Sequence, residues 1–283
     1  MEGILNGRAL RWWTILRIAL EERLVYRGDF ALGTLMRFLP IVTQVFLWWS
    51  IYETIGGGST KDVDIVGFSF QDMVAYYLLT MLSRAFSSMP GLASGIALQI
   101  RNGEIKKFII QPVDMVGFLL LTRIAHKLAY YSVAFGPFLF VFFICWWRGY
   151  FVTVSLPWTT WMAFVASLIM GFLIGFFLEA AIGMIGFWFL EVSSLLFVYM
   201  LLSFFLSGHM FPLTMLPEPY RSIVDLLPLK YLAYFPAAIC LKQVPADQLV
   251  GELLMEAAWL VFFIVMCRVM YNAGLRRYSG YGG

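Results

Sequence analysis

Residues 101–114 read RNGEIKKFIIQPVD, and they separate two long apolar runs of the chain. The run on the C-terminal side, residues 117–147, reads GFLLLTRIAHKLAYYSVAFGPFLFVFFICWW. A transmembrane helix needs about 20 mostly apolar residues, so this run is long enough to cross a bilayer. The charged stretch is basic and compatible with a helix that Pro112 stops. We therefore predict a short polar helix outside the membrane, between two spans.

The composition of the whole chain agrees with a membrane protein. Of its 283 residues, 61% are hydrophobic and only 13% are charged, and the mean hydropathy is +0.81. A soluble domain averages about 25% charged residues, so this chain cannot cover itself with polar surface. The modest net charge of +3 argues against a nucleic-acid-binding surface. The three cysteines lie too far apart for metal-ligand spacing or a disulfide framework.

Apolar runs predict an all-α membrane protein with six spanning helices, forming a single domain over residues 1–283. The spans are expected at residues 30–52, 72–100, 117–147, 157–179, 192–206 and 251–271. The sequence SSMPG at 87–91 predicts a kink in the second span. Residues 8–27 carry five arginines among apolar residues, which predicts a helix lying in the membrane interface. A cytosolic extension of the first span is the alternative.

Residues 207–247 do not follow the pattern of the spans. Five prolines within 25 residues exclude a single spanning helix, yet the segment is too apolar for a solvated loop. We predict short helices that dip into the outer leaflet and return, packed against protein because irregular backbone is tolerated there only when it is buried. Residues 215–227 are expected to be the most helical piece.

The distribution of basic residues predicts the orientation in the membrane. Ten basic residues lie in the N-terminal segment, the 101–114 stretch and the C-terminal tail, whereas five lie in the opposite loops. Because positive residues favour the cytoplasm, both termini and the 101–114 stretch are expected to face inward.

Residues with catalytic chemistry are scarce. No GxxxxGK[ST] phosphate loop occurs, so this chain is not expected to hydrolyse ATP by that route. The two histidines, His126 and His209, are too few for a zinc site. Ser207 and His209 are neighbours in sequence, which is poor geometry for a catalytic dyad. We predict that the chain is not an enzyme and binds no metal or cofactor.

Several charged residues lie within or near the predicted spans, where they are costly and often functional. They are Arg37, Arg84, Arg123, Lys127, Glu179 and Arg268. Glu179 is the only acid that we place deeply, and it either pairs with an arginine of another span or serves a transport path or proton coupling. Apolar side chains could also line a path, although lipid-facing packing explains them equally well: Met81, Phe86, Phe197, Met200 and Phe204.

Two stretches carry a resemblance that covers nearly the whole chain. The first runs from Arg101 through Ile105 to Gln111, Pro112 and Val113; the second combines SGHMFP at 207–212 with LP at 216–217 and LPLKY at 227–231. With the order of parts, these stretches resemble the membrane subunits of type-2 ABC transporters, the ABC-2 permease family. The YRGDF at 26–30 is similar to a subgroup of small bacterial permeases.

The resemblance implies a permease of an ATP-driven exporter in the bacterial inner membrane. Its expected partners are a separate ABC ATPase, which binds ATP and Mg, a second permease copy or paralogue, and membrane lipids. The ATPase-coupling residues would be Arg101, Asn102, Gly103, Glu104, Ile105, Lys106, Lys107, Phe108 and Pro112. The re-entrant gate would comprise Ser207, Gly208, Phe211, Pro212, Leu216, Pro217, Pro228 and Tyr231.

Alternatives remain open at this point. Lys106 and Lys107 could dock the ATPase or simply bind lipid headgroups as positive-inside residues. A self-contained secondary transporter or channel is the second interpretation of the chain, and a membrane enzyme the third, but secondary transporters often show internal repeats and none is visible. The substrate is not identified, although an apolar, aromatic-rich path favours lipids, hydrophobic drugs or lipid-linked glycans over ions.

Overall fold

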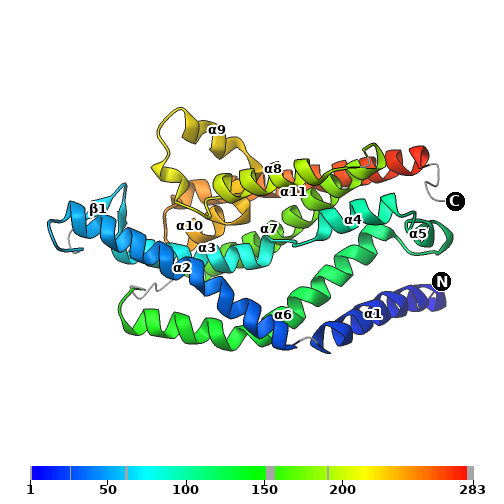
Figure 1. Ribbon diagram of the computed structural model, residues 1–283, viewed down its shortest axis with the longest axis horizontal. Helices are drawn as coiled ribbons and strands as arrows, with labels where there is room; N and C mark the ends of the chain where they lie inside the picture. The colour runs from blue at the N-terminus through cyan, green and yellow to red at the C-terminus, as the bar shows by residue number, and fades with distance from the viewer. Residues whose placement is uncertain (1, 26, 61–62, 151–156, 190, 279–283) are drawn as a thin grey trace. The chain divides into compact units, whose positions relative to one another are not determined.

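The described chain is mostly helical (Figure 1). The computed structural model describes residues 2–25, 27–60, 63–150, 157–189 and 191–278, with backbone alone for residues 2–9, 25, 27–32, 34, 35 and 37. Residue 26 of the predicted interfacial helix and of the YRGDF motif therefore lies outside the described residues, as do the side chains of Arg8, Arg27 and Arg37. The chain divides into two compact units, residues 1–44 with 106–148 and residues 45–105 with 149–283.

The first unit is built on two long helices that pack against each other. They are α1 (Glu2–Val25) and α6 (Met115–Trp147). The unit also contains the short α5 (Lys106–Ile110) and the first part of α2 (Arg27–Ile55). The rings of Phe38 in α2 and Phe138 in α6 lie 5.4 Å apart. A Cβ added to Gly117 would lie 3.2 Å from the Trp12 ring, so α1 approaches α6 closely at this glycine.

The second unit contains the remaining elements. A small antiparallel hairpin, β1 (Asp64–Ile65) and β2 (Phe68–Ser69), pairs Asp64 with Ser69 and Ile65 with Phe68. The helices that follow are α3 (Phe70–Ser87), α4 (Leu92–Arg101), α7 (Trp158–Met184), η1 (Ile185–Phe187), α8 (Ser193–Leu206), η2 (Leu213–Met215), α9 (Tyr220–Leu226), η3 (Pro228–Leu232), α10 (Tyr234–Cys240) and α11 (Ala246–Arg277). Ser69 begins α3 in a reciprocal capping arrangement with Asp72.

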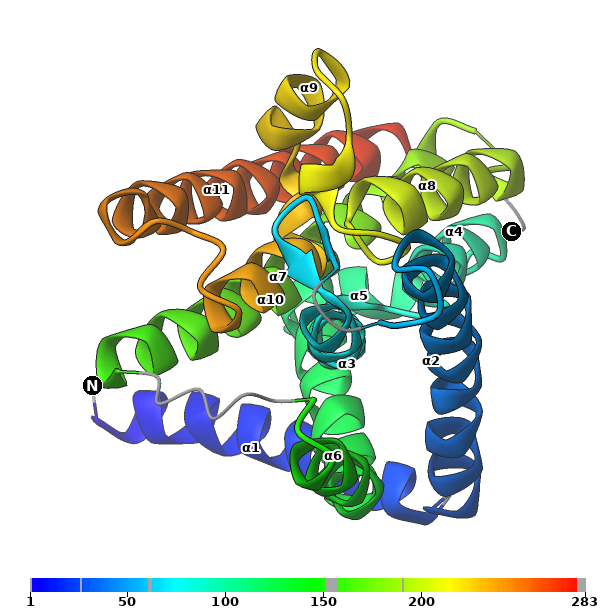
Figure 2. The ribbon, with the colours of Figure 1, turned by 90° about the vertical axis from the view of Figure 1, so that its left-hand side faces the viewer.

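Helix α7 is the centre of the second unit, packed against α11, α4, α3 and α10 (Figure 2). Glycines make these close contacts possible. A Cβ on Gly175 would overlap the carbonyl oxygen of Ser87, and a Cβ on Gly183 would lie 2.7 Å from that of Ala93. Gly171 and Gly175 form a GxxxG pattern, which lets helix backbones approach closely inside membranes.

Long apolar helices confirm the predicted helical membrane architecture in its coarse form. Among the described residues, three helices are long and apolar enough to cross a membrane: Met115–Trp147, Trp158–Phe187 and Ala246–Arg277. The predicted fifth span is the 14-residue α8, which is shorter than the roughly 20 residues that a span needs. The count of six spans stays a prediction.

The predicted second span is divided into two helices instead of being kinked. Helix α3 ends at Ser87, where the N–H of Ser88 donates to the carbonyl of Arg84 at 2.9 Å. Pro90 has no N–H to continue the helix, and Gly91 adopts a left-handed conformation with φ of 72° before α4 begins. These two residues therefore break the helix completely.

Candidate functional site

The predicted coupling segment begins where α4 ends. Gly103 has a φ of 75°, a conformation that favours glycine, and its N–H donates to the carbonyl of Ile100 at 3.1 Å. The N–H of Glu104 donates to the carbonyl of Gln99 at 2.9 Å. These two bonds satisfy carbonyls at the helix end in the manner of a glycine C-cap. The glycine thus turns the chain sharply after Arg101.

The second half of the segment belongs to the first unit and contains α5. Its Phe108 is buried and its ring lies 5.4 Å from that of Phe118 in α6, while the Lys107 ammonium lies 5.3 Å from the centre of the Phe108 ring. Asp114 then caps α6, accepting a hydrogen bond from the N–H of Gly117 at 2.7 Å. The packing of these two rings therefore holds α5 against the start of α6, and the cap fixes where α6 begins.

Burial divides the predicted coupling residues into two groups. Gly103, Ile105 and Phe108 are buried and anchor the segment. The exposed residues are Arg101, Asn102, Glu104, Lys106, Lys107 and Pro112. Ile110, which the sequence interpretation did not assign to docking, is 80% exposed. The segment thus presents charged side chains and two large apolar side chains, Ile109 and Ile110, on its surface.

Two adjacent tyrosines of α3 hold the start of the predicted gate. The Tyr76 hydroxyl donates to the carbonyl of Gly208, and the Tyr77 hydroxyl donates to the carbonyl of Met210 at 2.6 Å. The indole N–H of Trp48, in α2, donates to the Tyr77 hydroxyl at 2.6 Å. Because the bonds from Tyr76 and Tyr77 to the 208–210 backbone join residues more than 130 positions apart, sequence spacing carried no signal for them.

The rest of the predicted gate is a series of short helices, as the prolines predict. Pro212, Pro228 and Tyr231 are buried, Phe211 and Leu216 are half-buried, and Pro217 is exposed. Only α9 falls within residues 215–227, which were expected to be the most helical piece. Within the region, the Tyr234 N–H donates to the Ser207 carbonyl at 2.9 Å. A contact to α3 comes from Ser87, whose hydroxyl donates to the Leu232 carbonyl at 2.7 Å.

A polar cluster beside this region escaped the sequence analysis. Lys230 is 5% exposed, and its ammonium lies 2.9 Å from Glu252 Oε2. The Tyr231 hydroxyl donates to the same carboxylate at 3.0 Å. One turn further along α11, Glu256 is 0% exposed and accepts from the Ser167 hydroxyl at 3.2 Å. The prediction that Glu179 is the only deeply placed acid was therefore wrong.

That error has a physical reason. Glu252 and Glu256 lie near the start of the predicted sixth span, where acids ordinarily face the interface, and burial there depends on which face of α11 meets α7. The signal available in the sequence was their spacing of four residues, which places both on one face of a helix.

The predicted intramembrane residues lie on α3, α7 and α8. Arg84 donates to the Ser203 hydroxyl at 3.2 Å. Glu179 is half-buried. Phe86 is half-buried and Phe204 is 39% exposed. A role of these residues in a path stays a prediction.

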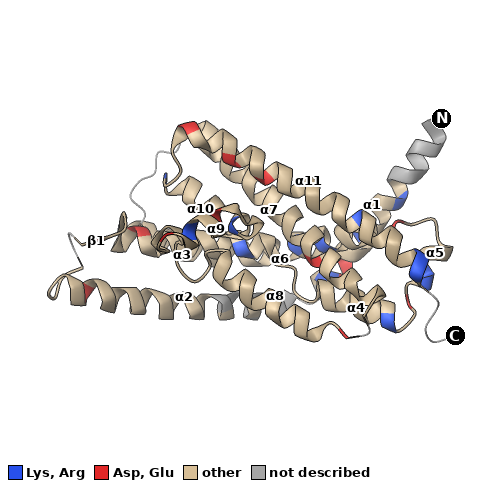
Figure 3. Ribbon diagram, turned by 90° about the horizontal axis from the view of Figure 1, so that it is seen from above, with Lys and Arg blue, Asp and Glu red and all other residues tan. Residues whose placement is uncertain are grey.

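Charges are separated along α11. Its acids, Asp247, Glu252 and Glu256, lie in the first half of the helix (Figure 3), whereas Arg268, Arg276 and Arg277 lie in the second half. Among the described residues, no group of three or more metal-ligating side chains gathers in one place.

We expect Tyr77→Phe to loosen the start of the gate. The substitution removes the donor to the Met210 carbonyl and leaves the Trp48 indole without its acceptor, and a lost buried hydrogen bond costs about 1–3 kcal/mol. Hydrogen–deuterium exchange of the 207–216 amides should rise by about tenfold. Tyr220→Phe, an exposed tyrosine of α9, is the matched control. Unchanged exchange in Tyr77→Phe would contradict the anchoring role.

Comparison with known proteins gives the chain a family. The family model described as "ABC-2 family transporter protein" matches residues 38–282, a range that includes the coupling segment, the predicted gate and the polar cluster of α11. No curated protein matches the chain. Since the matched range covers most of the sequence and contains the helices that are able to cross a membrane, the chain belongs to the ABC-2 transporter family.

Proposed function

We propose that this chain is the membrane subunit of an ATP-driven exporter, coupled to a separate ABC ATPase. The observation that carries the proposal is the family match over residues 38–282. A permease of this kind needs a surface on which the ATPase docks, and residues 101–114 offer one. The exposed Lys106, Lys107 and Glu104 would make ionic contacts, and the exposed Ile110 would be covered by the ATPase.

The proposed orientation places both termini and the coupling segment in the cytoplasm. Arg276 and Arg277 at the end of α11 support it, because positive residues favour the cytoplasmic side. In the same orientation, the short helices of residues 207–247 form a re-entrant gate at the outer side. We further propose that the chain crosses a bacterial inner membrane six times. It would pair with a second permease around a shared path. ATP-driven closure of the ATPases would then rock the two permeases as rigid bodies.

The docking assignment predicts a loss of assembly after charge reversal. In the triple variant Glu104→Lys, Lys106→Glu, Lys107→Glu, each ionic contact becomes a like-charge pair, which costs several kcal/mol across an interface. Co-purification with the ABC ATPase expressed from the same locus should fall at least tenfold, with a parallel loss of ATP-dependent transport.

The control variant exchanges the exposed ion pair of α9, Arg221→Asp with Asp225→Arg, whose charged atoms lie 3.7 Å apart. It carries altered charges far along the chain from the coupling segment and should assemble normally. Gel filtration of each permease variant alone checks that it is folded. If the triple variant binds the ATPase as well as the control does, the docking assignment is wrong.

A further inference from the structure

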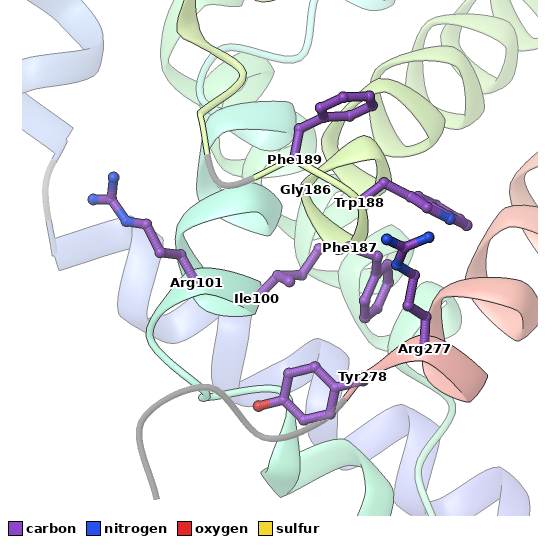
Figure 4. A pocket seen from close by; sticks show the side chains of 8 residues that line it. All are labelled: Ile100, Arg101, Gly186, Phe187, Trp188, Phe189, Arg277 and Tyr278. Carbon is purple, nitrogen blue, oxygen red and sulfur yellow. The ribbon is translucent and has the colours of Figure 1, made fainter.

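A small pocket lies in the second unit where α4, η1 and α11 end (Figure 4). Its volume is about 60 Å³, enough for about four water molecules or a group of similar size. It is lined by Ile100, Arg101, Gly186, Phe187, Trp188, Phe189, Arg277 and Tyr278. Of these residues, Arg101 alone belongs to the predicted coupling segment.

Two hydrogen-bond donors of this pocket are available for a ligand. Figure 4 shows the Arg277 guanidinium beside the rings of Phe187 and Trp188, with the Tyr278 hydroxyl on the other side of the pocket. The Tyr278 oxygen is buried and has no hydrogen-bond partner among the residues that the structure describes. A buried hydroxyl without a hydrogen-bond partner is destabilising, so a polar ligand atom would stabilise it.

The carbonyl groups at the helix ends beside the pocket are capped without the Arg277 guanidinium. Helix C-termini carry partial negative charge, which arginine can offset. Here backbone N–H groups already cap the last turns: Asn102 donates to Leu98, Trp188 to Ile185, and Tyr278 to Gly274. The Arg277 charge is therefore available to an anion.

The second arginine is engaged by an acid. Arg101 lies 3.8 Å from Glu191, and hydrogen bonds from Ser193 hold the pKa of Glu191 below its usual range. Glu191 is therefore ionised at neutral pH and offsets the Arg101 charge. Arg277 remains as the cation that a ligand would meet, with the Tyr278 hydroxyl as a second donor.

The position of the pocket along the helices indicates the kind of anion. Two helices able to cross a membrane, Trp158–Phe187 and Ala246–Arg277, both end at the pocket. The aromatic residues Phe187, Trp188 and Phe189 lie at the end of the first of these helices, as is typical of the membrane interface. A basic pocket between spans at headgroup level is suited to an anionic lipid.

We propose that this pocket binds the phosphate-bearing headgroup of an anionic membrane lipid. The Arg277 guanidinium donates to the phosphate oxygens, and the Tyr278 hydroxyl binds a second oxygen of the headgroup on the other side of the pocket. Charge-assisted hydrogen bonds from arginine to phosphate are among the stronger polar contacts in proteins. The two donors, Arg277 and Tyr278, lie outside the predicted coupling residues, so binding of the lipid requires no ATPase.

The test uses the full-length permease alone, delipidated in a neutral detergent, with phosphatidylglycerol, phosphatidylcholine or inorganic phosphate added. Thermal unfolding at increasing lipid concentration gives the apparent affinity, and native mass spectrometry detects the bound lipid. The variants are Arg277→Ala and Tyr278→Phe. The matched control is Arg276→Ala, which removes the same charge from the neighbouring residue, one that does not line the pocket.

Phosphatidylglycerol should protect the unmodified protein and Arg276→Ala equally. Arg277→Ala should bind about tenfold more weakly, because one charge-assisted bond is lost, and Tyr278→Phe about threefold more weakly. If Arg277→Ala does not fold, Arg277→Lys, which keeps the charge but not the paired donors, should show an intermediate loss. Equal protection by phosphatidylcholine, protection by inorganic phosphate alone, or equal losses in Arg276→Ala and Arg277→Ala would each overturn the proposal.

Discussion

The variant Gly175→Leu should not accumulate as folded protein. A Cβ at position 175 would already overlap the carbonyl oxygen of Ser87, and leucine adds three further carbon atoms. The obstacle is backbone at the end of α3, so it cannot rotate away as a side chain could. Overpacking of a core costs about 1–3 kcal/mol and occasionally more, and we expect at least about 3 kcal/mol here.

The measurement is fluorescence-detected gel filtration of detergent extracts, followed by the thermal unfolding midpoint of any folded fraction. Gly251→Leu is the matched control, because a Cβ at Gly251 in α11 meets nothing within 4 Å and leucine favours a helix over glycine. We expect the control to be neutral or slightly stabilised. Similar profiles for the two variants would refute the close approach of α7 to the end of α3.

A loss of about 3 kcal/mol is expected for Glu252→Gln, the second large effect. The substitution keeps an oxygen that accepts from Tyr231 but removes the charge that faces the buried Lys230 ammonium. Removing one partner of a buried ion pair costs about 3–5 kcal/mol, because the remaining charge is uncompensated. Glu252 is 34% exposed, which places the expected cost at the lower end of that range.

The double variant Glu252→Gln, Lys230→Met should recover most of this stability, since neither charge then remains buried. Asp225→Asn, which breaks the exposed Arg221–Asp225 pair, is the control and should cost less than about 1 kcal/mol. Thermal unfolding of the four proteins in the same detergent measures the differences. A double variant as unstable as Glu252→Gln alone would mean that the buried charge is not the cause.

The family of the chain could be predicted well from its sequence, because the features that carry it are local. SGHMFP at 207–212 and the polar segment at 101–114 are short, continuous motifs that remain recognisable whatever the rest of the chain does. The exposure of Lys106 and Lys107 followed in the same way, because charged residues just outside an apolar run stay in water. Their role in docking is a separate matter and awaits the charge-reversal experiment.

Long-range contacts could not be predicted from one sequence. The bonds from Tyr76 and Tyr77 to the 208–210 backbone depend on which face of α3 meets the start of the gate, and nothing in the spacing of these residues encodes that choice. The glycines of α7 did carry a signal, the GxxxG of residues 171–175, but it indicates a close helix contact without naming the partner.

The sequence by itself determined the membrane character and the positions of the long helices. The predicted span at 117–147 is observed as Met115–Trp147, since a run of apolar residues in a bilayer must satisfy its backbone hydrogen bonds internally and does so as a helix. The tertiary structure alone decided which polar groups are buried. Glu256 and Lys230 are enclosed because α7, α11 and η3 pack together through glycine-lined contacts, and that packing is a property of side-chain shapes brought together from distant parts of the chain.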